Sequence, residues 1–169
     1  VTALAIAALV RTGTSADSPM VLRAVQYVLT FQQSDGGIYQ RESAVANYET
    51  SIAILALHEC NTSGQYEEII KKARRFLTVI QWDESEGNTF ADPEYGGAGY
   101  GRHERPDLSN TTFLIDALKG VGASSDDPAI QRALIFVSRS QNLEGAYDIL
   151  EVAPKNPDGG FYYTPANGG

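Results

Sequence analysis

Hydrophobic residues along this chain follow two patterns that alternate. In the first pattern the residues are small and apolar on almost every side, which is typical of a helix buried all round. In the second, apolar residues recur at spacings of three and four, which predicts an amphipathic helix with one buried face. The first pattern lies near 2–11, 47–60 and 109–121, and the second lies near 18–33, 65–82 and 126–141. Strict alternation predicts an all-α protein of two layers, with the buried helices inside.

Each amphipathic segment carries the same skeleton. A basic residue and an alanine are followed by an aromatic residue, an aliphatic residue, a glutamine and then a double glycine; Arg23 begins the first copy. The glutamines are Gln32, Gln81 and Gln141, and the second glycines are Gly37, Gly97 and Gly160. The buried segments also align with one another, from Thr50, Thr111 and Thr2 onward. The chain is therefore predicted to be one domain, 1–169, of three helical hairpins near 1–39, 47–100 and 109–163.

This skeleton resembles the QW repeat of the prenyltransferase and squalene oxidase superfamily, which includes squalene-hopene cyclases and the β subunits of protein prenyltransferases. The stretch from Arg105 to Gly120 looks like uncharacterised bacterial members of that family. The resemblance implies an α/α toroid with the QW segments outside. A full toroid of this family has about six hairpins, so the chain is expected to form about half of the ring. Tyr39, Phe161 and Tyr162 stand where the family usually has tryptophan.

Catalytic acids are scarce by the standard of that family. Class II terpene cyclases protonate an alkene with an Asp-x-Asp-Asp cluster, and this sequence contains none. Asp116, alone in an apolar inner helix, and Glu49 remain as candidate acids or bases, although a hydrogen-bonded or surface-edge structural role is the favoured explanation of Asp116. The sequence is expected to be a binding or scaffold domain. The alternatives are a fragment of a terpene-cyclase-like enzyme acting on an isoprenoid, and a carbohydrate-active toroid.

No metal or cofactor is expected. His58 and Cys60 are two residues apart on a predicted helix, so their side chains point in nearly opposite directions and do not share a metal. The zinc set of the prenyltransferase β subunits and the thioester motif of complement-like toroids are both absent from the sequence.

The start of the inner helices is the candidate ligand site. Aromatic side chains with a few polar groups suit a lipid or sugar pocket, although helix capping and loop packing also explain these residues. The candidates are Tyr48, Asn110, Tyr39, Tyr100 and Tyr162.

Charge and composition limit the classes of partner that the chain is expected to bind. A formal charge of −8 argues against nucleic acid, which requires a basic face. Ten apolar residues at the start are too few for a membrane span, and they align with the inner-helix series. Self-association through the exposed edges of a half ring is expected. The sequence assigns no compartment.

Overall fold

The computed structural model describes residues 1–143 and 157–165 of the chain. These residues form six α-helices and one short 3₁₀ helix, without a named strand. The elements are α1 (Thr2–Arg11), α2 (Pro19–Leu29), α3 (Ala46–Glu59), α4 (Glu67–Val79), η1 (Glu84–Glu86), α5 (Leu108–Gly120) and α6 (Pro128–Ser140). The prediction of an all-α protein is confirmed. Part of the third predicted hairpin, 144–156, lies outside the described residues, as do residues 166–169.

Local sequence signals set where the helices begin. The Ser18 hydroxyl accepts a hydrogen bond from the Val21 N–H at the start of α2, and Asp127 accepts one from the Ala129 N–H at the start of α6. Each of these two helices has a proline directly after its cap, where the missing N–H costs nothing. Asp107 caps α5 in the same way, through the Asn110 N–H at 2.8 Å.

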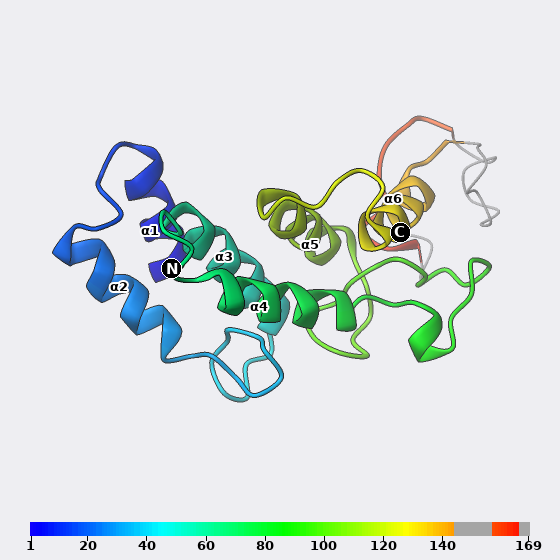
Figure 1. Cartoon of the computed structure of the whole chain (residues 1–169). Coiled ribbons are helices and arrows are strands. Elements are labelled where there is room, and N and C mark those ends of the chain that lie inside the picture. Colours follow the sequence, from blue (N-terminus) through cyan, green and yellow to red (C-terminus); the bar gives the residue numbers. More distant parts are fainter. Residues whose placement is uncertain (144–156, 166–169) are drawn as a thin grey trace.

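The helices form the two predicted layers. Among the inner helices, α3 lies between α1 and α5 and packs against both (Figure 1). Each outer helix packs on the inner helix that precedes it in the chain: α2 on α1, α4 on α3 and α6 on α5. This arrangement is a curved row of helical hairpins, consistent with a segment of an α/α toroid.

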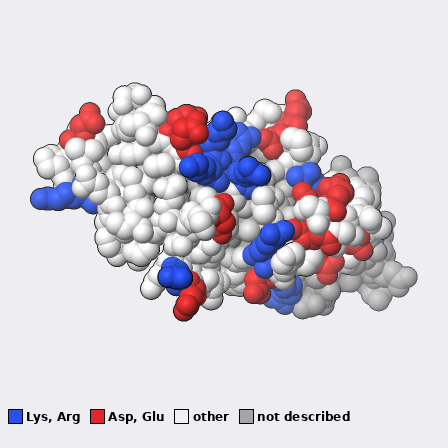
Figure 2. Space-filling view, turned by 60° about the horizontal axis from the view of Figure 1, so that its bottom comes forward, with Lys and Arg blue, Asp and Glu red and all other residues white. Residues whose placement is uncertain are grey.

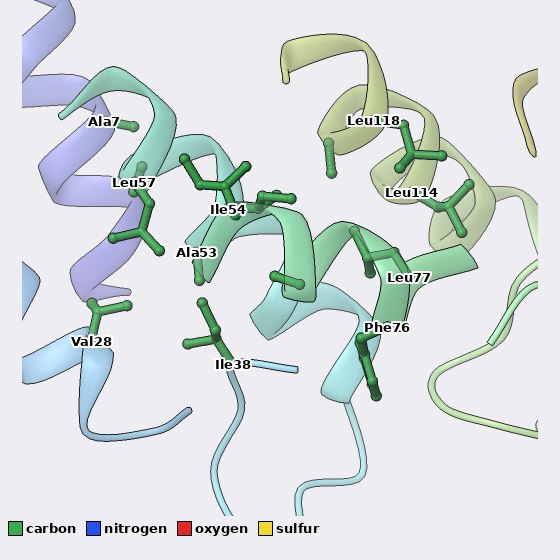
Figure 3. Close-up of a cluster of buried hydrophobic side chains, with 14 of the residues drawn as sticks. Ala7, Val28, Ile38, Ala53, Ile54, Leu57, Phe76, Leu77, Leu114 and Leu118 are labelled. Carbon is green, nitrogen blue, oxygen red and sulfur yellow. The ribbon is translucent and has the colours of Figure 1, made fainter. Parts of the chain in front are cut away.

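The hydrophobic core lies between the layers, as the labelled side chains of Figure 3 show. Ile54 and Leu57 of α3 have almost no exposed surface, and they belong to one buried cluster with Ala7 of α1 and Leu77 of α4. The small residues Ala53 and Ala56 of α3 are also buried. Burial of apolar surface contributes about 25 cal/mol per Å², and it is the main force that holds these layers together.

The outer helices end earlier than predicted. Instead of continuing through the repeated glutamines, α2, α4 and α6 stop at Leu29, Val79 and Ser140. Each glutamine then forms an isolated antiparallel bridge with the residue after the double glycine. The bridges are Gln32 with Ile38, Gln81 with Ala98 and Gln141 with Phe161. In the first two copies, pairing across the glycine turn therefore takes the place of the last predicted helical residues, whereas α6 extends to the residue before Gln141.

Each glycine loop is fastened to the start of the next inner helix. The Ile38 N–H donates to the Thr50 hydroxyl at 3.1 Å, and the Ala98 N–H donates to the Thr111 hydroxyl at 3.0 Å. Both threonines are fully buried. The aligned threonines thus join one hairpin to the next.

The glycine loops also press against the following outer helix. Gly36 and Gly96 have φ of +95° and +86°, where residues with a side chain are strained. A Cβ on Gly36 would lie 2.8 Å from the Lys72 carbonyl oxygen of α4, and one on Gly96 would lie 1.9 Å from the Arg132 carbonyl oxygen of α6. Contact with the following outer helix therefore requires a glycine at positions 36 and 96.

Candidate functional site

A cavity of about 320 Å³ opens where the first hairpin meets the start of α3. It is bounded by the start of α1, the end of α2, the first glycine loop and the first two turns of α3. Ten of the thirteen lining residues are aliphatic or aromatic, and Thr2, Gln40 and Glu49 supply polar groups. The apolar and aromatic lining residues are Val1, Ala3, Tyr27, Val28, Phe31, Ile38, Tyr39, Tyr48, Ile52 and Ala53. Three candidates from the sequence, Tyr39, Tyr48 and Glu49, therefore line one cavity.

Tyr48 separates this cavity from a second group of aromatic rings. Its ring packs edge-on against Phe113 of α5, with ring centroids 4.5 Å apart, and lies 5.7 Å from the Tyr100 ring. Its hydroxyl and that of Ser109 share a hydrogen bond of 2.6 Å. These contacts with α5 hold Tyr48 in place, so its ring forms a fixed wall of the cavity.

Tyr39 and Glu49 are tied to the first glycine loop. The Tyr39 hydroxyl donates to Asp35 at 2.5 Å, and its ring lies 5.4 Å from Phe76 of α4. Burial, followed by this hydrogen bond to a carboxylate, raises the pKa of Tyr39 from 10.0 to about 12. One carboxylate oxygen of Glu49 accepts the Gln40 N–H at 3.0 Å. Both side chains have structural partners on the loop and also face the cavity.

Asp116 lies apart from this group. It is exposed on α5 and does not line the cavity. A carboxylic acid that protonates an alkene needs a site shielded from water, so the surroundings of Asp116 do not suit that chemistry.

Asn110 is fully buried, and so is Asn47 of α3. The Asn110 amide donates to Asp107 at 2.8 Å, while the Asn47 amide donates to the carbonyl oxygens of Gly99 at 2.9 Å and Asn110 at 3.2 Å. The Ser51 hydroxyl donates to Asn47 at 3.1 Å. Asn110 therefore belongs to a polar network between α3 and α5, with no surface open to a ligand.

Tyr100 and Tyr162 lie on the later glycine loops, outside the cavity. The Tyr100 carbonyl accepts the Asn47 N–H at 2.9 Å, near the start of α3. At the equivalent place the Tyr163 carbonyl accepts the Leu108 N–H at 2.8 Å, at the start of α5. A hydrogen bond with Tyr100 raises the pKa of Tyr163 well above its usual range, with burial adding to the shift. These loops thus supply hydrogen bonds to the inner helices.

The three repeated glutamines have different surroundings. Gln81 is fully buried, and its amide donates to the carbonyl oxygens of Gly96 and Ala129, both at 2.9 Å. Ala129 belongs to the next outer helix, so Gln81 joins two hairpins. Gln141 donates to the Gly159 carbonyl at 3.3 Å, within its own loop. Gln32 is exposed.

The equivalent glycines also differ in what surrounds them. A Cβ on Gly37 would lie 2.5 Å from the Tyr39 ring, and one on Gly97 would lie 2.6 Å from the Phe136 ring of α6. One on Gly160 would have Asp158 of the same loop as its nearest neighbour, at 3.2 Å.

The buried roles of Asn47 and Asp107 were not predicted from the sequence. The local pattern does not show that Asn47 donates to the Asn110 carbonyl across 63 residues of chain, or that Asp107 accepts the Asn110 amide. The one available signal was their position: polar residues at the start of otherwise apolar helices, where an unpaired polar group would be costly.

The histidine and the cysteine that were considered as metal ligands do not lie in a common site. His58 is exposed and Cys60 is buried, and burial raises the pKa of the Cys60 thiol. Within the described part of the chain, no three His, Cys, Asp or Glu side chains gather as a metal-binding group. No helix in residues 1–143 and 157–165 has the length and hydropathy to cross a bilayer.

Residues 1–148 match the family described as squalene-hopene cyclase C-terminal domain. The matched segment contains all six α-helices and the first two glycine loops. A comparison with curated proteins gives no match.

Proposed function

The chain belongs to the squalene-hopene cyclase C-terminal domain family, and from this premise we propose that it binds an apolar isoprenoid in the cavity beside α3. It is a terpene-cyclase-like fragment. In this proposal its contribution is a binding surface and scaffold, with no catalytic acid among the described residues.

The composition of the cavity is the observation that carries this proposal. Ten of its thirteen lining residues are aliphatic or aromatic, and its volume of about 320 Å³ lies within the usual range for a small-molecule site. An isoprenoid chain offers only C–H and C=C groups, so it gains from apolar contact and needs few polar partners.

The carboxylates support a binding role for this part of the chain. Asp116 is exposed, and Glu49 accepts a backbone hydrogen bond from Gln40 at the cavity wall. Neither side chain has the dry setting that an alkene-protonating acid requires. Glu49 is better suited to receive a hydrogen bond from the hydroxyl end of an isoprenoid alcohol.

Farnesol is a suitable probe because it has an isoprenoid chain and one hydroxyl group. Binding is measured by heteronuclear NMR on the wild type, on Ile52→Asp at the cavity wall and on Leu134→Asp, an exposed residue of α6 outside the cavity. We expect Ile52→Asp to weaken binding at least about tenfold, because the ligand would desolvate a carboxylate. Leu134→Asp should bind like the wild type.

Three results would overturn the proposal. The first is equal weakening by both substitutions, and the second is binding of a disaccharide such as maltose in preference to farnesol. The third is formation of cyclic hydrocarbons when the chain is incubated with squalene and the extract is analysed by gas chromatography. That third result would assign a catalytic role to this chain.

A further inference from the structure

Two junctions within the chain are built on the same plan, with a glycine loop pressed against the next outer helix. At the second junction, Arg132 of α6 pairs with Asp83 at 3.2 Å and approaches Glu84 at 3.9 Å. Gln81 is fully buried, and its side-chain oxygen accepts a hydrogen bond from Arg132 Nε at 3.4 Å. At the second junction the cation therefore has carboxylate partners.

The first junction has the same cation position without the same partners. Lys72 of α4 corresponds to Arg132, and Ser34 takes the place of Asp83, two residues after the repeated glutamine. Asp35 takes the place of Glu84, but its carboxylate accepts the Gly37 N–H at 2.9 Å and the Tyr39 hydroxyl. Among the described residues, Lys72 forms no ion pair. The first junction therefore lacks a carboxylate that pairs with Lys72.

A groove of about 610 Å³ lies at this unmatched junction. Lys72 and Arg75 line it from α4, one helical turn apart, and Arg102 lines it from the second glycine loop. Arg102 has only a distant contact with Glu86, at 4.0 Å. Asp35 is the single carboxylate among the lining residues. Three cations against one carboxylate give the groove a local positive charge, although the chain carries −8.

The wall of the groove also has an apolar part. Phe76, Val79 and Ile80 line it beside the cations, and the Val79 side chain is exposed. In Figure 2 the Lys and Arg side chains gather near the middle of one face, while Asp and Glu dominate towards the end where the grey residues lie. Cationic and apolar walls together suit an anion that carries an organic group.

We propose that this groove binds a phosphate-bearing ligand. The forked N–H groups of two arginines and the ammonium of Lys72 would hold the phosphate oxygens, and Phe76 and Val79 would contact the organic part. The site is on the outer layer, separate from the cavity beside α3. Its existence does not depend on isoprenoid binding.

The test uses pyrophosphate and isothermal titration calorimetry at low salt, with thermal unfolding to confirm that each variant folds. Lys72→Ala combined with Arg75→Ala should weaken binding at least about tenfold, because each charge-assisted hydrogen bond lost accounts for about that factor. Ser34→Asp, which restores the acid of the second junction, should weaken binding as well. Arg23→Ala is the matched control, since Arg23 is the equivalent exposed position of α2 outside the groove.

Unchanged affinity in the Lys72 and Arg75 variant, or an equal loss in Arg23→Ala, would refute the site. The source of the phosphate is tested with vesicles of phosphatidylglycerol and of phosphatidylcholine. Pyrophosphate binding together with sedimentation on phosphatidylglycerol vesicles alone supports a lipid headgroup, whereas pyrophosphate binding without sedimentation supports a soluble phosphate ester. Sedimentation on both kinds of vesicle, unaffected by the variants, counts against the proposal.

Discussion

Replacing Gln81 with alanine is the sharpest perturbation of the contact between hairpins. Its side chain is fully buried and donates two hydrogen bonds of 2.9 Å, to Gly96 in its own loop and to Ala129 in the next outer helix. Gln32 occupies the same repeat position and is exposed. The chain therefore supplies its own control: the same substitution at a buried and at an exposed copy.

The expected cost follows from these contacts. Each hydrogen bond contributes about 1 kcal/mol net, and carbonyl oxygens left without their partner add to this. Deleting the buried methylene groups leaves a small cavity, so the total loss for Gln81→Ala is about 3 kcal/mol. For a chain of 169 residues this corresponds to a fall in Tm of roughly 6 to 12 °C. Gln32→Ala should change stability by less than about 0.5 kcal/mol.

Urea unfolding followed by circular dichroism at 222 nm measures both variants against the wild type, and an unchanged slope would show that the same surface unfolds. Equal effects of the two substitutions, whether both small or both large, would contradict the assignment of Gln81 as the link between hairpins.

Three further substitutions test other parts of the structure. Asn47→Leu should destabilise by about 3 kcal/mol, since it leaves buried polar partners unsatisfied, and a loss under 1 kcal/mol in urea unfolding would refute the network. Gly96→Ala should cost well over 1 kcal/mol because its Cβ would meet the Arg132 carbonyl, whereas Gly87→Ala, at φ +82° with open space around it, should cost only about 1 kcal/mol; similar losses would argue against the tight contact. Because the folded pKa of Tyr39 is raised from 10.0 to about 12, its stabilising contribution is complete below pH 10 and is lost as the pH rises through about 12. The difference between the 295 nm absorbance titrations of the wild type and Tyr39→Phe should show a tyrosine that ionises near pH 12, and the absence of that difference would refute the assignment.

The sequence predicts the layers well because hydrophobic spacing reports directly on burial. The aligned apolar runs beginning at Thr2, Thr50 and Thr111 are the inner helices of the structure. The double glycines recur in every copy of the repeat, and Gly36 and Gly96 have the positive φ that glycine adopts without strain.

Hydrophobic periodicity does not predict contacts between residues that are far apart in the sequence. The outer helices were predicted to continue to the glutamines, but the bridge from Gln32 to Ile38 takes the place of their last turn. The burial of Gln81 and the exposure of Gln32 depend on what the next helix presents, which the repeat pattern does not distinguish. The placement of Tyr39, Tyr48 and Glu49 around one cavity likewise arises from packing among four segments.

The proposal that the cavity beside α3 binds an isoprenoid is tested most directly by locating the bound probe. Intermolecular nuclear Overhauser effects between farnesol and the methyl groups of Ile52 and Ala53 measure whether it lies against the α3 wall of the cavity. We expect cross-peaks to both residues and none to Ile115 of α5, which lies outside the cavity. Cross-peaks to Ile115 without any to Ile52 or Ala53 would contradict the account.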